Sequence, residues 1–254
     1  MTVIAIGGAE DKTGDCTVLR RVLAEAGAVE GQAPRVLVIT TATGYPEEVG
    51  EKYTATFQRI GVTSRVRHVT TRAGAADAAL LADVAAADVI FFTGGDQMKL
   101  ATVFNGTPFM DALRQRETDG AVIAGTSAGA AVMSSLMIYG GDPEKAMEKG
   151  EVLLTAGLGL APNVVFDTHF LNRNRLARLF NVLATAPDKT GIGLDEDTGV
   201  ILRGKTLEVI GSGKVTVVDA KAAQSNITTI ERGDVFTLTG ATVHTLKHGD
   251  KFRL

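Results

Sequence analysis

Short apolar runs alternate with alanine-rich amphipathic segments through the first 190 residues, and this alternation restricts the fold more than any other feature of the sequence. The apolar runs lack the polar residue at every second position that a half-exposed strand would show, so they predict strands buried on both faces. Helices between such strands are typical of a doubly wound, mainly parallel sheet, and we predict an α/β fold of that kind. The predicted strands are 3–6, 35–40, 64–69, 89–93, 121–124 and 191–194, and the predicted helices are 16–28, 45–60, 75–87, 98–104 and 108–119.

The pattern changes to β-rich segments over residues 200–254. Gly-Ser-Gly and Lys-His-Gly-Asp sequences separate these segments and predict hairpins. We interpret this region as antiparallel additions to the main sheet. Since 45 % of the 254 residues are hydrophobic, we expect residues 1–254 to form one α/β domain that includes this β-rich extension, and two closely packed lobes are the alternative.

Charge and composition exclude several classes of function. The net charge of −3, with both signs spread along the chain, argues against a nucleic-acid surface or a polybasic membrane patch. The single cysteine, Cys16, allows no internal disulfide framework and no cysteine-based metal site. No apolar stretch reaches about eighteen residues, and the chain start lacks the basic flank of a signal peptide. We therefore expect a cytoplasmic protein that binds neither nucleic acid, membrane nor metal.

One serine stands in a chemically suggestive turn. The sequence AVIAGTSAGAAVMS at 121–134 predicts a buried strand, a sharp turn with Ser127 at its tip, and a helix start. The small neighbours Gly125 and Gly129 would let the backbone turn tightly and expose the hydroxyl, as in the nucleophile elbow G-x-S-x-G. The same motif also occurs by chance, so an ordinary strand-to-helix turn is the competing interpretation.

Two other glycine-rich turns follow predicted strands, at 6–12 (IGGAEDK) and 92–100 (FTGGDQMKL). Neither matches G-x-G-x-x-G or the Walker sequence, which disfavours a nucleotide site. Because ligands of parallel sheets collect at the carboxyl ends of the strands, we expect these turns to converge with Ser127. Their backbone N–H groups could then stabilise a developing oxyanion.

A serine nucleophile needs a base, and His169 is the best candidate among four histidines. It follows an apolar strand that begins at Val164, and it precedes a helix rich in arginine. Core packing explains such a position poorly. His68 lies within a predicted strand, while His244 and His248 lie in the polar C-terminal region, where a solvated role is the simpler interpretation.

Five ordered segments give the chain a resemblance to a known family. It resembles the cyanophycinases, within the family of dipeptidase E-like serine peptidases. The resemblance implies a flavodoxin-like or class I glutamine amidotransferase-like sheet, a serine mechanism without cofactor, and a homodimer. It also implies a substrate, cyanophycin, whose arginines are attached to a polyaspartate backbone, and release of β-Asp-Arg dipeptides. The matching segments are IGGAEDK at 6–12, FFTGGDQ at 91–97, GTSAGA at 125–130, DTHFLNRNRLARL at 167–179 and IGLDEDTG at 192–199.

The resemblance assigns Ser127 as nucleophile and His169 as general base. It favours Glu196, after the apolar strand 191–194, as the third member, and Asp142 and Asp167 are the alternatives. The predicted oxyanion hole combines the N–H of Ala128 with that of Gly94 or Gly95.

A substrate site is also implied. Guanidinium groups bind carboxylates in a planar, bidentate way, so Arg173, Arg175 and Arg178 could clamp the free α-carboxylates of a β-linked substrate. Their spacing predicts that Arg175 and Arg178 share a helix face while Arg173 points elsewhere. A solvated basic helix face is the competing interpretation. Many family members carry Gln at the position of Thr168, which bears on how substrate is held. Gln97, Asp167, Glu10 and Asp11 are the candidate partners for the substrate's arginine, and Thr168 is included in the predicted substrate site.

Four alternatives remain at this stage. An aspartyl dipeptidase of the dipeptidase E type would share the same nucleophile. An α/β-hydrolase esterase would use a C-terminal base, His244 or His248. A class I glutamine amidotransferase would require cysteine where this chain has Ser127. A binding protein without turnover could retain the pocket alone.

Overall fold

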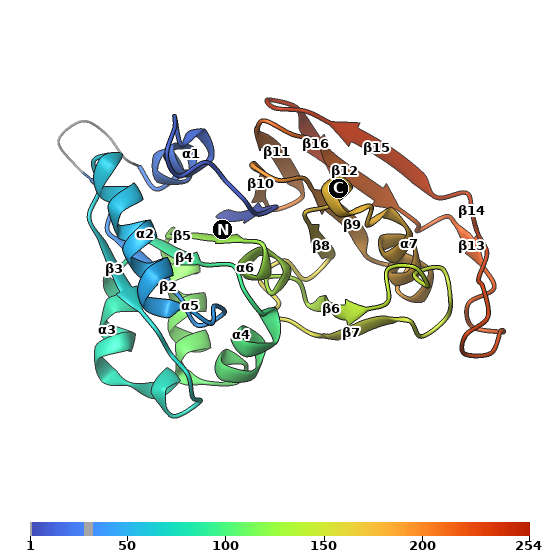
Figure 1. Ribbon diagram of the computed structural model, residues 1–254, viewed down its shortest axis with the longest axis horizontal. Coiled ribbons are helices and arrows are strands. Elements are labelled where there is room, and N and C mark those ends of the chain that lie inside the picture. Colours follow the sequence, from blue (N-terminus) through green and yellow to red (C-terminus); the bar gives the residue numbers. More distant parts are fainter. Residues whose placement is uncertain (1, 28–32) are drawn as a thin grey trace.

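The computed structural model describes residues 2–27 and 33–254, and its strands form two main sheets and two short hairpins (Figure 1). The helices are α1 (Thr17–Glu25), α2 (Pro46–Arg59), α3 (Ala78–Ala86), α4 (Gln97–Phe104), α5 (Pro108–Thr118), α6 (Ala128–Ala131) and α7 (Leu176–Thr185), with 3₁₀ turns at Gly74–Ala76 and Leu171–Arg173. The strands are β1 (Thr2–Ile6), β2 (Val36–Ile39), β3 (Ser64–Arg67), β4 (Val89–Phe92), β5 (Val122–Thr126), β6 (Leu136–Gly141), β7 (Val152–Ala156), β8 (Val164–Thr168), β9 (Thr190–Leu194), β10 (Thr198–Arg203), β11 (Thr206–Gly211), β12 (Val215–Asp219), β13 (Gln224–Ser225), β14 (Leu238–Thr239), β15 (Thr242–Leu246) and β16 (Lys251–Arg253).

The larger sheet has eight strands in the order β16-β11-β10-β1-β5-β4-β2-β3. The five strands from β1 to β3 in this order are parallel, and β10, β11 and β16 extend the sheet in antiparallel fashion. Every residue of β2, β4 and β5 is buried, as their unbroken apolar sequences require. The predicted α/β class with a large, mainly parallel sheet is therefore confirmed.

Helices cover both faces of the parallel strands. Successive residues of a strand point to opposite faces, and Phe91 and Phe92 of β4 show this clearly. The ring of Phe91 packs against Phe57 of α2 at a centroid distance of 6.0 Å. The ring of Phe92 lies 6.3 Å from Phe104 and 6.2 Å from Phe109, at the ends of α4 and α5. Helices α1 and α2 thus share one face of the sheet, and α3, α4 and α5 share the other.

The predicted helices and strands up to residue 124 are confirmed, with ends shifted by a few residues. The predicted end of the first helix, residue 28, lies outside the described residues. Helix α3 begins later than predicted because Asp77 caps it, accepting a hydrogen bond from the N–H of Leu80 at 2.9 Å.

The smaller sheet is a departure from the sequence prediction. Strands β8 and β9 pair in parallel with each other, and β12 and β15 add to β9 in the order β15-β12-β9-β8. The prediction that the β-rich region 200–254 adds to the main sheet is therefore correct only in part, because β10, β11 and β16 extend that sheet whereas β12 and β15 belong to the smaller one. Strand pairing over such sequence separations depends on tertiary packing, which local pattern does not encode.

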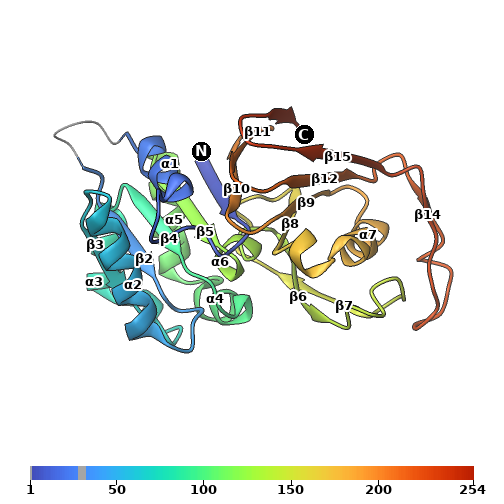
Figure 2. The same cartoon turned by 45° about the horizontal axis from the view of Figure 1, so that its top comes forward.

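The two sheets meet where several strands end. Helix α6 directly follows β5 and contacts both β5 and β8 (Figure 2). Strand β1 joins this junction, because the carbonyl of Gly7 accepts a hydrogen bond from the N–H of His169 at 2.9 Å. The carboxyl ends of β1, β5, β8 and β9 therefore surround one location.

Candidate active site

Ser127 occupies the turn between β5 and α6 in a conformation that few residues adopt. Its φ is 52° and its ψ is −112°, outside the regions favoured by non-glycine residues. The Ser127 N–H donates to the carbonyl of Ile6 at 2.9 Å, which ties the turn to β1. A Cβ on Gly129 would lie 2.3 Å from the carbonyl oxygen of Phe92, and one on Gly125 would lie 2.5 Å from that of Gly129. Both glycines of the predicted elbow are thus required by close backbone contacts.

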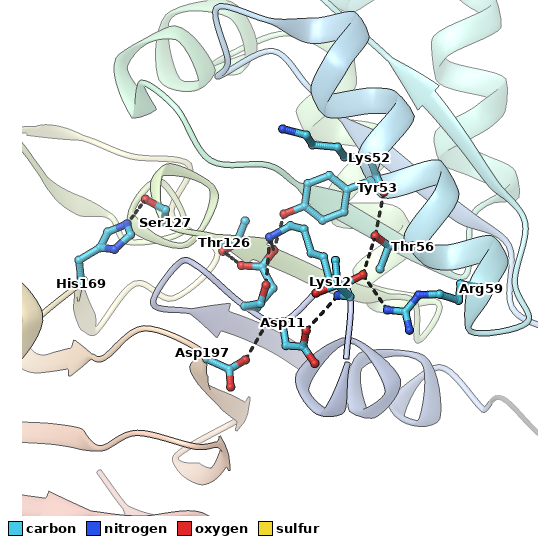
Figure 3. Close-up of polar contacts among 12 residues, drawn as sticks. Asp11, Lys12, Lys52, Tyr53, Thr56, Arg59, Thr126, Ser127, His169 and Asp197 are labelled. Carbon is cyan, nitrogen blue, oxygen red and sulfur yellow. Dashed lines mark hydrogen bonds and ion pairs between the residues drawn. The ribbon is translucent and has the colours of Figure 1, made fainter. Parts of the chain in front are cut away.

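Ser127, His169 and Glu196 form a continuous polar chain. Ser127 Oγ lies 2.9 Å from His169 Nε2, a contact drawn in Figure 3. His169 Nδ1 lies 2.7 Å from Glu196 Oε1. Because a carboxylate only accepts hydrogen bonds, Nδ1 carries the proton and Nε2 is left to accept one from the serine hydroxyl. The arrangement has the geometry of a nucleophile, a general base and an orienting acid.

His169 is held by the segment that follows β1. Its backbone is left-handed, with φ of 48°, directly after β8 ends. Its imidazole lies against Gly8, where a Cβ would be 2.4 Å from Cε1 and 2.5 Å from Nε2. Any side chain at Gly8 would collide with the ring, so this glycine makes room for the base.

Glu196 lies in a turn between β9 and β10 that is fixed from several directions. Its N–H donates to Asn172 Oδ1 at 3.1 Å, and its carbonyl accepts from Thr198 Oγ1 at 2.9 Å. The next residue, Asp197, donates its N–H to the carbonyl of Gly8 at 2.9 Å. The carboxylate is thereby aimed at His169 although 38 % of the side chain is exposed.

The two rival acids are placed differently. Asp142 is exposed after β6 and accepts the N–H of Glu144 at 2.9 Å. Asp167 is buried, and its two carboxylate oxygens bind the guanidinium of Arg178. Neither carboxylate reaches the imidazole that Glu196 contacts.

Burial lowers the pKa of His169 below its ordinary value of 6.5. The hydrogen bond that His169 donates to Glu196 opposes this shift, and the positive charges of Arg173 and Arg175 add to it. A lowered pKa keeps the imidazole neutral at pH 7, the state in which Nε2 can take a proton.

The predicted oxyanion donors lie beside the serine. As the first residue of α6, Ala128 has an N–H without an acceptor inside the helix. A Cβ on Gly94 would lie 3.4 Å from Ser127 Cβ and 3.9 Å from Oγ. Gly95 has φ of +140°, and a Cβ there would lie 2.2 Å from the carbonyl oxygen of Ala42. The turn after β4 therefore contacts Ser127 at Gly94 and packs against the backbone of Ala42 at Gly95.

The three predicted arginines, which follow His169 in the sequence, line one cavity of about 210 Å³. Arg173, Arg175 and Arg178 share it, so the prediction that Arg173 points elsewhere is wrong. Helical spacing does not apply to Arg173, because it lies in a 3₁₀ turn and α7 begins only at Leu176. The cavity also contains Asp142 and the backbone of β6.

The arginines differ in how freely they can bind a ligand. Arg175 donates to the carbonyl of Thr168 at 2.6 Å, and burial followed by the charge of Arg178 lowers its pKa to about 10. Arg178 is engaged by Asp167. Arg173 is exposed. A lowered pKa means that the charged form of Arg175 is destabilised in this position, and a bound anion would stabilise it.

Several predicted substrate contacts need correction. Asp167 and Thr168 are buried in β8. The carboxylate of Asp167 accepts from Arg178 and the carbonyl of Thr168 accepts from Arg175, so both residues hold the arginines in place instead of contacting substrate. Glu10 is enclosed and has no exposed side-chain surface. Asp11 accepts backbone N–H groups in its own loop, which lowers its pKa to about 2. Gln97 stays half-exposed, with its amide nitrogen donating to the carbonyl of Ile138 at 2.8 Å.

Sequence reasoning missed residues that support the site. Asn172 and Asp197 lie inside the family-like segments and anchor the Glu196 turn, so those segments contained a signal. Thr126 lies within the elbow itself. Tyr53, on the distant helix α2, had no signal in the sequence, because its contact with the loop after β1 forms only in the folded chain.

Within the described part of the chain, no group of three His, Cys, Asp or Glu residues is arranged to hold a metal ion. None of the helices over the same residues is long and apolar enough to span a membrane.

Comparison with known proteins defines the class. The model of Peptidase family S51 matches residues 3–210. The chain belongs to this family and is a serine peptidase.

Relatives named cyanophycinase match nearly the whole chain. The protein from Nostoc sp. (strain PCC 7120 / SAG 25.82 / UTEX 2576) is 38% identical, covering 99% of this chain and 85% of that protein. The protein from Geminocystis herdmanii (strain PCC 6308) is also 38% identical, covering 99% of this chain and 93% of the relative.

Two solved structures share the fold. A peptidase from an acI-B1 Actinobacterium has a TM-score of 0.75 at 23% identity, covering 100% of this chain and 96% of that one. A putative peptidase E protein from Listeria monocytogenes EGD-e has a TM-score of 0.59 at 17% identity, covering 84% of this chain and 98% of that one.

Proposed function

We propose that the protein is a serine exopeptidase that hydrolyses cyanophycin, multi-L-arginyl-poly-L-aspartate, to β-Asp-Arg dipeptides. The observation that carries the proposal is the hydrogen-bonded series Ser127–His169–Glu196, and the cavity lined by Arg173, Arg175 and Arg178 adds an anion site. Its relatives named cyanophycinase, 38% identical over 99% of the chain, give the substrate.

The polar chain supports an acyl-enzyme mechanism. Ser127 Oγ attacks the scissile carbonyl carbon while His169 Nε2 takes the hydroxyl proton, and Glu196 stabilises the imidazolium. The tetrahedral oxyanion receives hydrogen bonds from the N–H of Ala128 and from Gly94 or Gly95. Collapse breaks the C–N bond as His169 returns the proton to the leaving amine. Water, activated by the same imidazole, then releases the acyl group.

The cavity fits a ligand that carries both charges. A β-linked aspartyl unit has a free α-carboxylate. We assign its binding to Arg173, which is exposed, and to Arg175, which is partly buried in the same cavity. The substrate's guanidinium needs a carboxylate, and Asp142 lines the same cavity. Asp142 therefore replaces the buried Asp167 as the proposed partner, and Gln97 remains a second one.

An aspartyl dipeptidase activity is the second candidate, since the same nucleophile and anion site would serve a smaller α-aspartyl substrate. The esterase alternative is disfavoured by its proposed bases. His244 lies on β15 with its ring 4.7 Å from that of Phe252, whereas His169 contacts Ser127.

Further predictions belong to this proposal. The parallel order β3-β2-β4-β5 corresponds to strands 2-1-3-4 of a flavodoxin-like sheet, which supports the flavodoxin-like or glutamine amidotransferase-like assignment. A homodimer, a cytoplasmic location and a single domain over residues 1–254 stay predictions. Light scattering of the purified protein tests the dimer.

A substrate panel tests the proposed function. The protein is incubated with cyanophycin, an α-aspartyl dipeptide and p-nitrophenyl acetate, and products are identified by mass spectrometry. We expect β-Asp-Arg from cyanophycin with the highest kcat/KM of the three. Faster cleavage of the dipeptide would favour the second candidate. Activity that survives His169→Ala but not His244→Ala would instead favour the esterase.

A further inference from the structure

The carboxylate of Glu10 is buried directly beneath the serine turn. Glu10 lies in the segment that follows β1, and none of its side-chain surface is exposed. Its Oε1 accepts from the hydroxyl of Tyr53 and lies 2.9 Å from Lys12 Nζ. Its Oε2 accepts from the hydroxyl of Thr126 at 2.5 Å. Figure 3 shows the side chains of Tyr53, Lys12 and Thr126 directed toward one another, with Ser127 next to Thr126.

Such a carboxylate is costly to bury unless its oxygens are paired. The donors come from three separate parts of the chain, namely α2, the loop after β1, and the end of β5. Burial, followed by the charge of Glu10, raises the pKa of Tyr53 well above its usual value, so this phenol stays protonated and donates. Both carboxylate oxygens of Glu10 already have hydrogen-bond partners and the side chain is not exposed, so substrate binding does not explain this buried carboxylate.

Thr126 links this buried group to the nucleophile. It is the last residue of β5 and directly precedes Ser127, whose φ of 52° is rarely adopted by a residue with a side chain. A turn of this kind persists only where its surroundings fix it. The Ser127 N–H is held by Ile6, and the Thr126 side chain is held by Glu10. The two anchors act on adjacent residues.

The same segment contacts the other members of the polar chain. Gly7 accepts the N–H of His169, and Gly8 accepts that of Asp197, each at 2.9 Å. The N–H of Asp11 donates to Asp197 Oδ1, also at 2.9 Å. Since this segment touches the serine, histidine and glutamate turns, a group that fixes it also fixes their relative positions.

We propose that Glu10 is a positioning residue that acts through the Thr126 hydroxyl to hold Ser127 in its reactive conformation. The inference rests on the proposed role of Ser127 as nucleophile. Glu10 itself contacts neither substrate nor reacting atoms. Its contribution lies in the geometry of the turn, so its loss should slow attack by Ser127 and leave substrate affinity unchanged.

Four variants and the wild type test this inference: Thr126→Val, Thr126→Ser, Glu10→Gln and Thr107→Val. Thr126→Val removes the hydroxyl at nearly constant shape, and Thr126→Ser restores it. Glu10→Gln removes the negative charge and replaces one acceptor oxygen by an NH2 group that can only donate, so the hydroxyls of Tyr53 and Thr126 cannot both donate as they do to the carboxylate. Thr107→Val is the matched control, because Thr107 is also buried and its hydroxyl donates to the carbonyl of Phe104 at 2.7 Å, between α4 and α5.

The measurements are the rate of covalent labelling by a fluorophosphonate, kcat and KM for cyanophycin, and the melting temperature. We expect labelling and kcat to fall at least tenfold in Thr126→Val and in Glu10→Gln, with KM within twofold of wild type. Thr126→Ser should stay within threefold of wild type. Thr107→Val should lower the melting temperature without slowing labelling.

Labelling of Thr126→Val and Glu10→Gln within twofold of wild type would overturn the inference. A decrease in Thr107→Val equal to that in Thr126→Val would also overturn it, since the effect would then follow general stability. Should Thr126→Val fail to fold, Glu10→Gln decides alone. Failure of the proposed function looks different: wild type would remain unlabelled, or Ser127→Ala would be labelled equally fast.

Discussion

At the scale of single residues, the surroundings of His169 shift the pKa of its imidazole in opposite directions. Burial and two arginines favour its neutral form, while Glu196 favours the charged form. The balance lies on the neutral side, which suits a base that must accept a proton at the start of each cycle. The arginines that line the cavity therefore also act on the base.

The pH dependence of kcat/KM should reflect this balance. The base works when unprotonated, so activity is lost as pH falls through the pKa of His169, and the midpoint should lie below pH 6.5, the ordinary value. Arg173→Gln removes a positive charge that lowers this pKa, so the midpoint should move to higher pH. The shift should shrink at high salt, because Arg173 is exposed.

Lys251→Gln, on the edge strand β16, is the control for that pH profile. It should leave the midpoint unchanged. A midpoint that is identical in wild type and Arg173→Gln would refute the coupling between the cavity and the base.

The identity of the acid gives a second prediction. Glu196→Gln keeps the shape but removes the charge that stabilises the imidazolium, and kcat should fall by about 10²–10⁴-fold. Asp142→Asn should raise KM for an arginine-containing substrate and change kcat less than threefold. Steady-state kinetics of both variants test the assignment. A large loss of kcat in Asp142→Asn together with a small loss in Glu196→Gln would make Asp142 the acid instead.

At the scale of secondary-structure elements, the site depends on turns that follow strands. Helix α6 is only one turn long, and it packs so closely on β4 that Gly129 touches the carbonyl of Phe92. The elbow motif predicted this turn correctly, since its glycines are there for backbone contact. The arginine helix was predicted less well, because a 3₁₀ turn precedes α7 and brings Arg173 into the cavity.

A substitution at Gly129 tests this packing. Gly129→Ala places a Cβ 2.3 Å from a backbone oxygen that cannot move freely, and it should lower the free energy of unfolding by about 1–3 kcal/mol. Gly44→Ala, where nothing lies within 4 Å of the new Cβ, should change it by less than about 0.5 kcal/mol. Urea denaturation measures both, and equal stability of the two variants would contradict the close packing of α6.

At the scale of the whole molecule, the polar chain joins two sheets. Ser127 follows β5 of the large sheet, whereas His169 and Glu196 follow β8 and β9 of the small one. The segment after β1 connects them, because the carbonyls of Gly7 and Gly8 accept hydrogen bonds from the N–H groups of His169 and Asp197. The geometry of this polar chain thus depends on how the two sheets pack together.

This architecture explains how much the sequence could predict. Local periodicity predicted the parallel strands and their helices. The elbow motif predicted Ser127, the position of His169 at a strand end predicted the base, and the resemblance to cyanophycinases added Glu196. The second sheet escaped prediction because β8, β9, β12 and β15 pair across long separations. The burial of Asp167 and Glu10 was not predicted either. A charged residue in a family-like segment is easily interpreted as a substrate contact, and its burial becomes evident only from its partners in the fold, here Arg178 and Tyr53.

The proposed role of Ser127 as the nucleophile in the hydrolysis of cyanophycin can be tested directly. The most direct measurement is release of β-Asp-Arg from cyanophycin by wild type and by Ser127→Ala, quantified by mass spectrometry, with binding to the insoluble polymer measured in parallel. The account predicts release by the wild type, a loss of about 10³-fold or more in Ser127→Ala, and retained binding. Release by Ser127→Ala at a rate near that of the wild type would contradict it.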